Sequence, residues 1–128
     1  MNKFRRKLLD DINLNMREES ITNRHWITIS VHPGLSEEFI REFSDKLDWT
    51  ILSQKQKFTD EFILEFKHLI DLDYCFIHNK VGFPIIKKFI PKTTFRSIYD
   101  FKVSHLSDIQ KKEIQRLIDF KRTFKKLM

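Results

Sequence analysis

The side chains of this sequence best suited to bind a metal ion or to form a nucleophile–base pair are five histidines and one cysteine. His68 and His78 lie on either side of Cys75, so a His–Cys cluster is chemically conceivable. Their spacing matches neither HExxH, nor HxH, nor a zinc-binding Cys/His pair. His78 instead aligns with Ser30 and Ser53 in a sequence repeat, which favours a polar structural role over metal binding. We therefore predict no metal site.

The carboxylates also lack a catalytic pattern. Glu37 and Glu38 recur as Asp60 and Glu61 at the same place in two copies of the repeat, whereas a catalytic pair is normally unique. Acids in the first turn of a helix are stabilised by the positive end of its dipole, which explains them without catalysis. No GxSxG or Walker A motif is present, and two glycines are too few for a phosphate-binding loop. We predict no enzymatic activity, no catalytic residues and no cofactor; a small hydrolase with a His/Asp site is the least favoured alternative.

Two adjacent segments, residues 26–48 and 49–71, repeat each other without a gap. In each copy a residue suited to cap a helix, Ser36 or Thr59, precedes two acids and an apolar stripe. The stripe is spaced for one helical face. Its members are Phe39, Ile40, Phe43 and Leu47 in the first copy and Phe62, Ile63, Phe66 and Ile70 in the second. Each copy is therefore predicted to end in a helix of roughly three turns.

The segment that opens each copy, WITIS or WTILS, is compatible with two structures. The alternation of Ile27, Ile29 and Val31 is typical of a short strand, whereas the polar run SQKQK in the second copy favours a helix. We predict a short helix in both copies. Before the repeats, apolar residues spaced for one face predict an N-terminal helix over roughly residues 3–18.

Weaker copies follow the first two. Tyr74 and then Tyr99 continue the series begun by Trp26 and Trp49, each at an interval of 25 residues. Pro84 stands where the first two copies have their capping residue, and proline is well tolerated at a helix start. We expect the four aromatic residues that open the copies to be buried anchors.

These patterns together predict an all-α fold. Ser107 and Gln110 form a capping-box pattern at the start of a final helix. One copy cannot bury its own apolar stripe, so neighbouring copies must stack. We predict a single domain, 1–128, with an N-terminal helix in 1–20. A compact stack of four degenerate helical repeats of about 23–25 residues follows in 25–128, the last two being weak.

The order of the repeated residues resembles a known short repeat. W-x-x-x-S, then L-[ST]-[DE]-E-F-I-x-x-F, then D-W, over residues 26–73, is similar to repeats in uncharacterised proteins of phages, giant viruses and low-GC bacteria. This resemblance implies a helical-repeat architecture and a viral or phage origin. It implies no activity and no site residues.

Charge is distributed unevenly along the chain. Residues 1–79 contain 11 Lys/Arg and 14 Asp/Glu, a net charge of −3, whereas residues 80–128 contain 13 and 4, a net charge of +9. Such asymmetry indicates a protein partner with an acidic surface, or nucleic acid; a solvated basic face is the alternative without a partner. In the last helix, Phe120 and Phe124 are expected to anchor the helix and turn its charges outward. The candidate partner-binding residues are Lys87, Lys88, Lys92, Arg96, Lys121, Arg122, Lys125 and Lys126.

Composition narrows the class of function further. No apolar stretch is long enough to span a membrane, and no apolar run follows the basic N-terminus, as a secretory signal requires. A single cysteine fits a reducing, intracellular setting, in a host cytoplasm or within a virion. We predict a non-enzymatic interaction protein of viral or phage origin that docks a protein partner through its surface, with no membrane and no small-molecule substrate. Nucleic-acid binding by the basic C-terminal half is the alternative.

Overall fold

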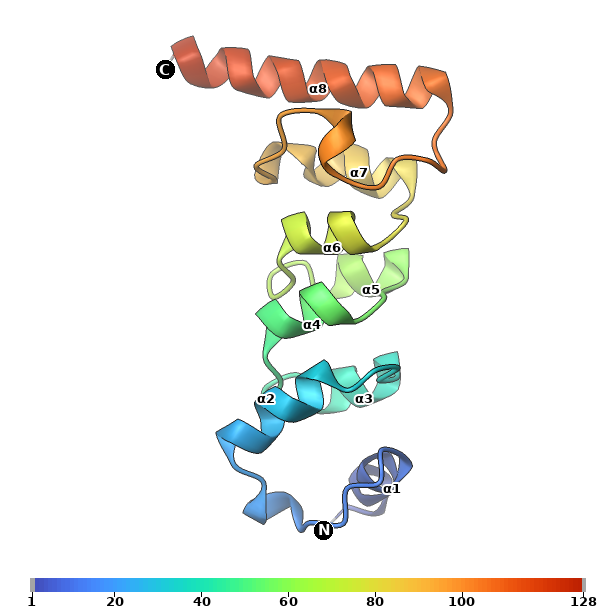
Figure 1. Ribbon diagram of the computed structural model, residues 1–128, viewed down its shortest axis with the longest axis vertical. Helices are drawn as coiled ribbons and strands as arrows, with labels where there is room; N and C mark the ends of the chain where they lie inside the picture. The colour runs from blue at the N-terminus through green and yellow to red at the C-terminus, as the bar shows by residue number, and fades with distance from the viewer. Residues whose placement is uncertain (1, 128) are drawn as a thin grey trace. The chain divides into compact units, whose positions relative to one another are not determined.

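The computed structural model describes the backbone of residues 2–127 and the side chains of residues 2–125 (Figure 1). All regular secondary structure in this range is helical, which confirms the predicted all-α fold and the helical form of WITIS and WTILS. The elements are α1 (Lys3–Asp11), η1 (Glu18–Ser20), α2 (Asn23–Val31), α3 (Glu37–Glu42), α4 (Trp49–Lys55), α5 (Asp60–Glu65), α6 (Leu72–His78), α7 (Phe83–Phe89), η2 (Ile90–Lys92), η3 (Ile98–Asp100) and α8 (Asp108–Leu127), where η denotes a 3₁₀-helix.

The chain forms two compact units, Met1–Gln56 (the N-terminal unit) and Lys57–Met128 (the C-terminal unit). The boundary falls inside the second sequence repeat, between α4 and α5. Each unit has its own buried aromatic and aliphatic side chains, and we describe each one separately.

Side-chain caps set the starts of the repeat helices. The Ser36 hydroxyl accepts the Phe39 N–H at 3.0 Å, and the Thr59 hydroxyl accepts the Phe62 N–H at 3.2 Å, so both predicted caps are confirmed. Asp48 caps α4 in the same way, and its counterpart in the next repeat caps α6. From α3 to α6 the capping groups therefore alternate between hydroxyl and carboxylate.

The N-terminal helix is shorter than predicted. It ends at Asp11 because Asn13 adopts a left-handed conformation with φ of 62°, which asparagine tolerates better than most residues. The Leu14 N–H then bonds to the Leu9 carbonyl at 3.0 Å, and the Asn13 N–H bonds to the Asp10 carbonyl at 2.9 Å. This Schellman arrangement satisfies carbonyls that a continuing helix would have used.

The N-terminal unit packs α2 against α4 around Trp26. The Trp26 ring lies 5.2 Å from the Phe43 ring between centroids, and both side chains are buried. Ser30 is fully buried because its hydroxyl donates to the Trp26 carbonyl at 2.8 Å and accepts the Asp48 N–H at 2.9 Å. The Gln56 amide donates to the carbonyls of Ser30 and His32 at the end of α2. The repeated serine therefore links a helix interior to the start of the next helix.

The third repeat keeps the 23-residue interval, not the predicted interval of 25. Its helix α7 is capped at Gly82, which lies 23 residues after Thr59, and Pro84 falls inside the first turn. A Cβ atom at Gly82 would lie 2.3 Å from an Asp60 carboxylate oxygen, and the Gly82 N–H donates to that carboxylate. A side chain at this position would displace the Asp60 carboxylate from the Gly82 N–H, so glycine favours this contact where the earlier copies have a hydroxyl cap.

This shorter interval corrects the predicted anchors. Trp26 is buried as predicted and Trp49 is half-buried, but Tyr74 is 38% exposed and Tyr99 is 87% exposed. Leu72, directly after its cap, occupies the place of Trp49. The prediction for His78 is also wrong, because His78 is exposed and Phe76 fills the place of the buried serines. The position of the cap, rather than the nearest aromatic residue, determines which side chains are buried.

Candidate interaction surface on the C-terminal helix

The helix α8 carries the candidate site. The predicted capping box is confirmed: the Gln110 N–H donates to the Ser107 hydroxyl at 3.1 Å, and the Ser107 N–H donates to the Gln110 side chain at 3.0 Å. Ile114 and Ile118 are fully buried, and α8 packs against α7 and η2 (Figure 1). One face of α8 therefore holds it in the C-terminal unit.

Three apolar side chains on the opposite side of α8 are exposed, and Glu113 and Arg116 lie between the first and the other two. Ile109, Phe120 and Phe124 are 80%, 70% and 52% exposed, and we call these three residues the outer face. The two phenyl rings stack on each other, with 6.1 Å between centroids and 17° between planes. The expected anchoring by Phe120 and Phe124 is therefore wrong. Phe120 follows Ile118 by two residues, or about 200° around a helix, so Ile118 and Phe120 cannot both face the core.

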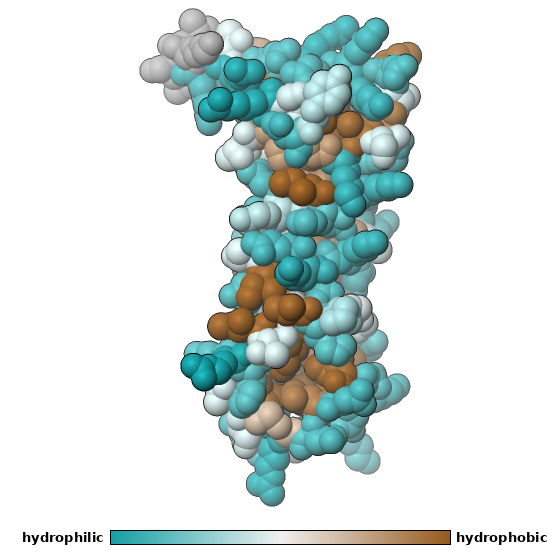
Figure 2. Space-filling model, viewed as in Figure 1, coloured by the Kyte–Doolittle hydropathy of each residue, from teal (hydrophilic) through white to brown (hydrophobic). Residues whose placement is uncertain are grey.

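Hydrophobic side chains also reach the surface elsewhere. On the face drawn in Figure 2, the largest brown area lies in the lower half, over the N-terminal unit, and smaller brown groups lie among hydrophilic ones above it. In the N-terminal unit, Ile27 and Val31 are the exposed large aliphatic side chains of α2, and each is a little more than half covered. The outer face of α8 differs because its three members are more exposed and lie on one side of one helix.

A basic cleft lies between the last turns of α8 and the chain that follows η2. Its volume is about 450 Å³. It is lined by Thr93, Thr94, Phe95, Arg96, Lys121, Arg122 and Lys125, and we call it the basic cleft. Four predicted partner-binding residues from two distant segments therefore come together in one place.

Lys121 forms the inner wall of the basic cleft. Its ammonium group donates to the Thr93 carbonyl at 2.7 Å, to the Ile90 carbonyl at 3.3 Å and to the Phe95 carbonyl at 3.5 Å. This orientation is inward, contrary to the predicted outward one. Burial lowers the pKa of Lys121, the positive charge of Lys125 lowers it further, and Asp73 acts in the opposite direction.

The remaining cations of the cleft have no acidic partner in the described part of the chain. The Arg122 guanidinium contacts the Arg96 carbonyl at 3.5 Å. The nearby Asp73 accepts the Thr94 N–H and hydroxyl. Asp100 accepts the backbone N–H groups of Arg96 and its neighbour at 2.8 Å and 3.2 Å. Both carboxylates bind backbone groups of the segment that lines the cleft, and they offset part of its charge without pairing with its side chains, so four cations against two acids leave a net positive charge.

The other predicted residues lie elsewhere. The Lys87 ammonium pairs with Glu113 at 2.7 Å and stands 5.9 Å from the centre of the Phe83 ring. Lys88 and Lys92 stand over the Phe89 ring, at 5.6 Å and 5.9 Å. The side chain of Lys126 lies outside the described residues. The predicted set of eight residues therefore divides into a cleft of four cations and separate lysines on α7 and η2.

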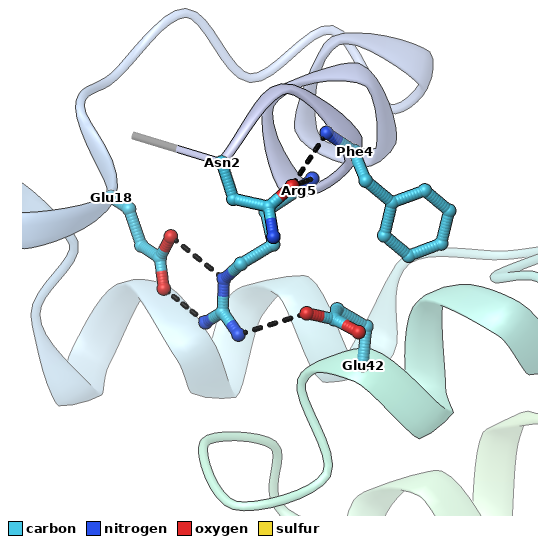
Figure 3. A network of polar contacts seen from close by, with 5 residues as sticks. All are labelled: Asn2, Phe4, Arg5, Glu18 and Glu42. Atoms are coloured by element: carbon cyan, nitrogen blue, oxygen red, sulfur yellow. Dashed lines mark hydrogen bonds and ion pairs between the residues drawn. The ribbon is translucent and has the colours of Figure 1, made fainter.

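In the N-terminal unit, by contrast, the cation Arg5 pairs with carboxylates of the same unit (Figure 3). Arg5 donates from Nε to Glu18 at 3.0 Å and from Nη1 to Glu42 at 3.1 Å, and it makes a further short contact with Glu18. Its guanidinium lies 4.5 Å from the centre of the Phe43 ring. The hydrogen bond to Glu18 is the largest cause that raises the pKa of Arg5. Two carboxylates therefore neutralise this cation.

Reactive groups give no further site in the described residues. No three His, Cys, Asp or Glu side chains among them are grouped to hold a metal ion. Burial raises the pKa of the Cys75 thiol to about 12, and the charges of Asp60 and Asp71 contribute. A thiol with this pKa stays protonated at neutral pH and is a poor nucleophile. None of the described helices is long and apolar enough to cross a membrane.

Comparisons with known proteins add no family. No protein-family model, no curated protein and no solved structure matches the chain. The geometry of α8 and of the basic cleft is therefore the basis for assigning a function.

Proposed function

We propose that this protein is a non-enzymatic interaction module that docks an acidic protein partner on the outer face of α8. The observation that carries the proposal is the exposure of Ile109, Phe120 and Phe124 on a helix whose opposite face is already buried. Fully burying one such side chain contributes about 1.5–3 kcal/mol. Three of them on one side of a helix supply a contact of the kind that anchors protein interfaces.

Charge indicates the chemistry of the partner. The C-terminal unit contains fifteen Lys/Arg and nine Asp/Glu, a net charge of +6. A second copy of this chain would bring two such surfaces together and would be repelled. A partner whose acidic residues surround an apolar stripe would be attracted and would cover the phenyl rings. The viral or phage origin implied by the repeat remains a prediction.

A selection from a random peptide library displayed on phage tests this proposal. We expect the wild-type protein to enrich peptides that combine Asp or Glu with aromatic or large aliphatic residues. The double variant Phe120→Ser, Phe124→Ser should bind these peptides at least about tenfold more weakly, because it removes most of the apolar area of the outer face. Equal binding by wild type and variant would contradict the proposal.

A matched control distinguishes specific binding at the outer face from non-specific binding to any exposed apolar side chain. Ile27→Ser with Val31→Ser removes exposed apolar side chains from α2 of the N-terminal unit. This control should leave binding of the selected peptides within about twofold of wild type. If the control weakens binding as much as the α8 variant does, the outer face has no special role.

Single-stranded nucleic acid is the second candidate partner. The stacked rings of Phe120 and Phe124 lie beside Lys121 and Lys125 in sequence, and bases stack on exposed aromatic rings next to cationic grooves. Titration with an oligothymidine at several salt concentrations tests this candidate. Binding through phosphates requires an affinity that falls steeply as salt rises.

A further inference from the structure

The basic cleft contains several cations that form no ion pair within the described part of the chain. Arg96, Lys121, Arg122 and Lys125 line one cleft, and none of them pairs with a carboxylate in the described part of the chain. Like charges held together repel each other unless an anion lies between them. Arg5 shows the alternative, because two glutamates neutralise it within the chain. An anion from outside the chain would supply the negative charge and the hydrogen-bond acceptors that Glu18 and Glu42 supply to Arg5.

The cations of the cleft have different tasks. Lys121 is already held by three carbonyls, so it supplies positive charge but few donors. Arg96, Arg122 and Lys125 supply the donors. Two arginines give two planar groups that each match an oxyanion through paired N–H bonds. The cleft therefore fits a compact oxyanion with several oxygens better than a single carboxylate.

Stabilisation of the helix end does not account for this arrangement. Cations in the last turn of a helix complement its negative end, which explains Lys125. Arg96 belongs to a different segment of the chain, and Lys121 donates to carbonyls of η2 and the following loop, not of α8. Two of the four cations are therefore unrelated to the end of α8.

The positive charge forms one focus and not a track. Lys87 is paired with Glu113, and Lys88 and Lys92 stand over the Phe89 ring. Arg116 lies nine residues before Lys125, which places it on the opposite side of α8. Lys111 and Lys112 lie fourteen and thirteen residues before Lys125, or about 20 Å along the helix axis. A nucleic-acid strand carries one charge on each phosphate and needs a row of cations, whereas a phosphate monoester carries up to two charges on one group. The single focus favours the monoester.

We propose that the basic cleft binds the phosphoryl group of a phosphorylated serine or threonine on the protein that docks against α8, an inference that rests on the proposed function. Clusters of arginine recognise phosphorylated side chains in other interaction modules. Phe124 of the outer face lies three residues after Lys121 of the cleft, and side chains three residues apart are neighbours on a helix surface. A partner segment on the outer face can therefore place a phosphorylated side chain in the cleft. Phosphorylation would then strengthen docking.

Nuclear magnetic resonance titration of the ¹⁵N-labelled full chain tests the cleft. The probes are N-acetyl-phosphoserine methylamide, its unphosphorylated counterpart, inorganic phosphate and an oligothymidine, all at constant ionic strength. We expect the phosphoserine probe to shift the amide signals of residues 93–97 and 121–125, and the unphosphorylated probe to shift none. Equal responses to these two probes would overturn the inference. Tighter binding of inorganic phosphate or of the oligonucleotide than of the phosphoserine probe would also overturn it, and would assign the cleft to a free anion or to nucleic acid.

Variants of the two arginines give the second readout. Arg96→Gln with Arg122→Gln should weaken phosphoserine binding at least about tenfold, because both guanidinium groups and their paired N–H bonds to the phosphoryl oxygens are lost. Lys121 is left unchanged because it holds the loop. Lys80→Gln, an exposed position between α6 and α7, removes one charge from the same unit and should leave binding within about twofold. Equal weakening by Lys80→Gln would show only a response to net charge and would overturn the inference.

Different variants test the docking of a peptide on the outer face and the binding of a phosphoryl group in the basic cleft, so each proposal can be contradicted without the other. The variant Phe120→Ser, Phe124→Ser should leave binding of the phosphoserine probe unchanged, because the rings do not line the cleft. The arginine variant should leave the unphosphorylated peptides selected on the outer face bound within about twofold. Loss of peptide binding alone would contradict the docking face, and loss of probe discrimination alone would contradict the cleft.

Discussion

The two units of this protein differ in their net charge and in how the cations described above are paired. The N-terminal unit contains nine Lys/Arg and nine Asp/Glu, and Arg5 is enclosed by two glutamates. The C-terminal unit has the same number of acids and fifteen Lys/Arg, and four of these cations line one cleft without pairing with a carboxylate in the described residues. Both units otherwise use the same capped helices and the same apolar stripe. The comparison concerns two sites: Arg5 is paired with carboxylates of its own unit, whereas the four cations of the basic cleft have no carboxylate partner in the described residues.

The largest expected effect separates phenylalanines of the core from those of the outer face. Phe39→Ala should lower the free energy of unfolding by about 3–5 kcal/mol, because Phe39 is almost fully buried in the N-terminal unit. Phe120→Ala should change it by no more than about 0.5 kcal/mol, because that ring is 70% exposed. Urea denaturation followed by circular dichroism measures both. A large loss from Phe120→Ala would place this ring in the core and remove the docking face.

Lys121 is the one cation of the cleft that we expect to stabilise the fold. Lys121→Met should cost about 1–3 kcal/mol, because the carbonyls of Ile90 and Thr93 lose a charged donor. The pKa of Lys121 is lowered on folding, so the unfolded chain binds more protons just below pH 10.5. The wild type should therefore gain stability relative to Lys121→Met as the pH rises toward 10.5. Thermal melting at neutral and alkaline pH gives both results, and a variant as stable as wild type would contradict them.

Arginine substitutions test the comparison of the two units directly. Arg5→Gln should cost about 1–2 kcal/mol, since its side chain is 23% exposed and its loss leaves two glutamates without their partner. Arg122→Gln should have an effect within about 0.5 kcal/mol, because it removes no ion pair. Denaturation curves of the two variants provide the measurement. Equal losses would show that the cations of both units serve the fold alike.

The smallest effect concerns what the two units share. Ser36→Ala in the N-terminal unit and Thr59→Ala in the C-terminal unit should each cost about 1 kcal/mol, because each removes one N-terminal cap. Peptide binding on the outer face should survive both changes. Similar losses, measured by denaturation, would confirm that the units differ in surface charge and not in how their helices begin. Loss of binding without loss of stability would instead assign these hydroxyls to a functional surface.

Local features of the fold could be predicted from the sequence. The caps at Ser36 and Thr59 and the capping box at Ser107 were predictable because each bond spans only three residues. The apolar stripes were predictable only in part. Helices α3 and α5 have six residues each, so the predicted length of three turns is wrong, and the last two members of each stripe lie beyond the helix. Phe66 is half-buried. The third repeat was misplaced by two residues because the aromatic Tyr74 was a more conspicuous marker than Gly82. Only the contact with Asp60 shows why glycine takes the place of a hydroxyl cap there.

The face of α8 that is exposed depended on tertiary structure. Two sets of apolar residues on α8 have helical spacing, and packing against α7 and η2 buries Ile114 and Ile118 while it exposes Phe120 and Phe124. Sequence spacing cannot decide between two such faces, because the choice depends on what the rest of the chain presents.

The sequence by itself determined the helical class, the capped starts of the repeat helices and the excess of cations after residue 80. Tertiary structure decided which of those cations act together. Arg96 and Arg122 are 26 residues apart, and a contact over that separation forms only when the loop after η2 folds back against α8. Capping and helical spacing are local and follow from residue type, whereas convergence of distant charges requires a path of the chain that no short-range interaction specifies.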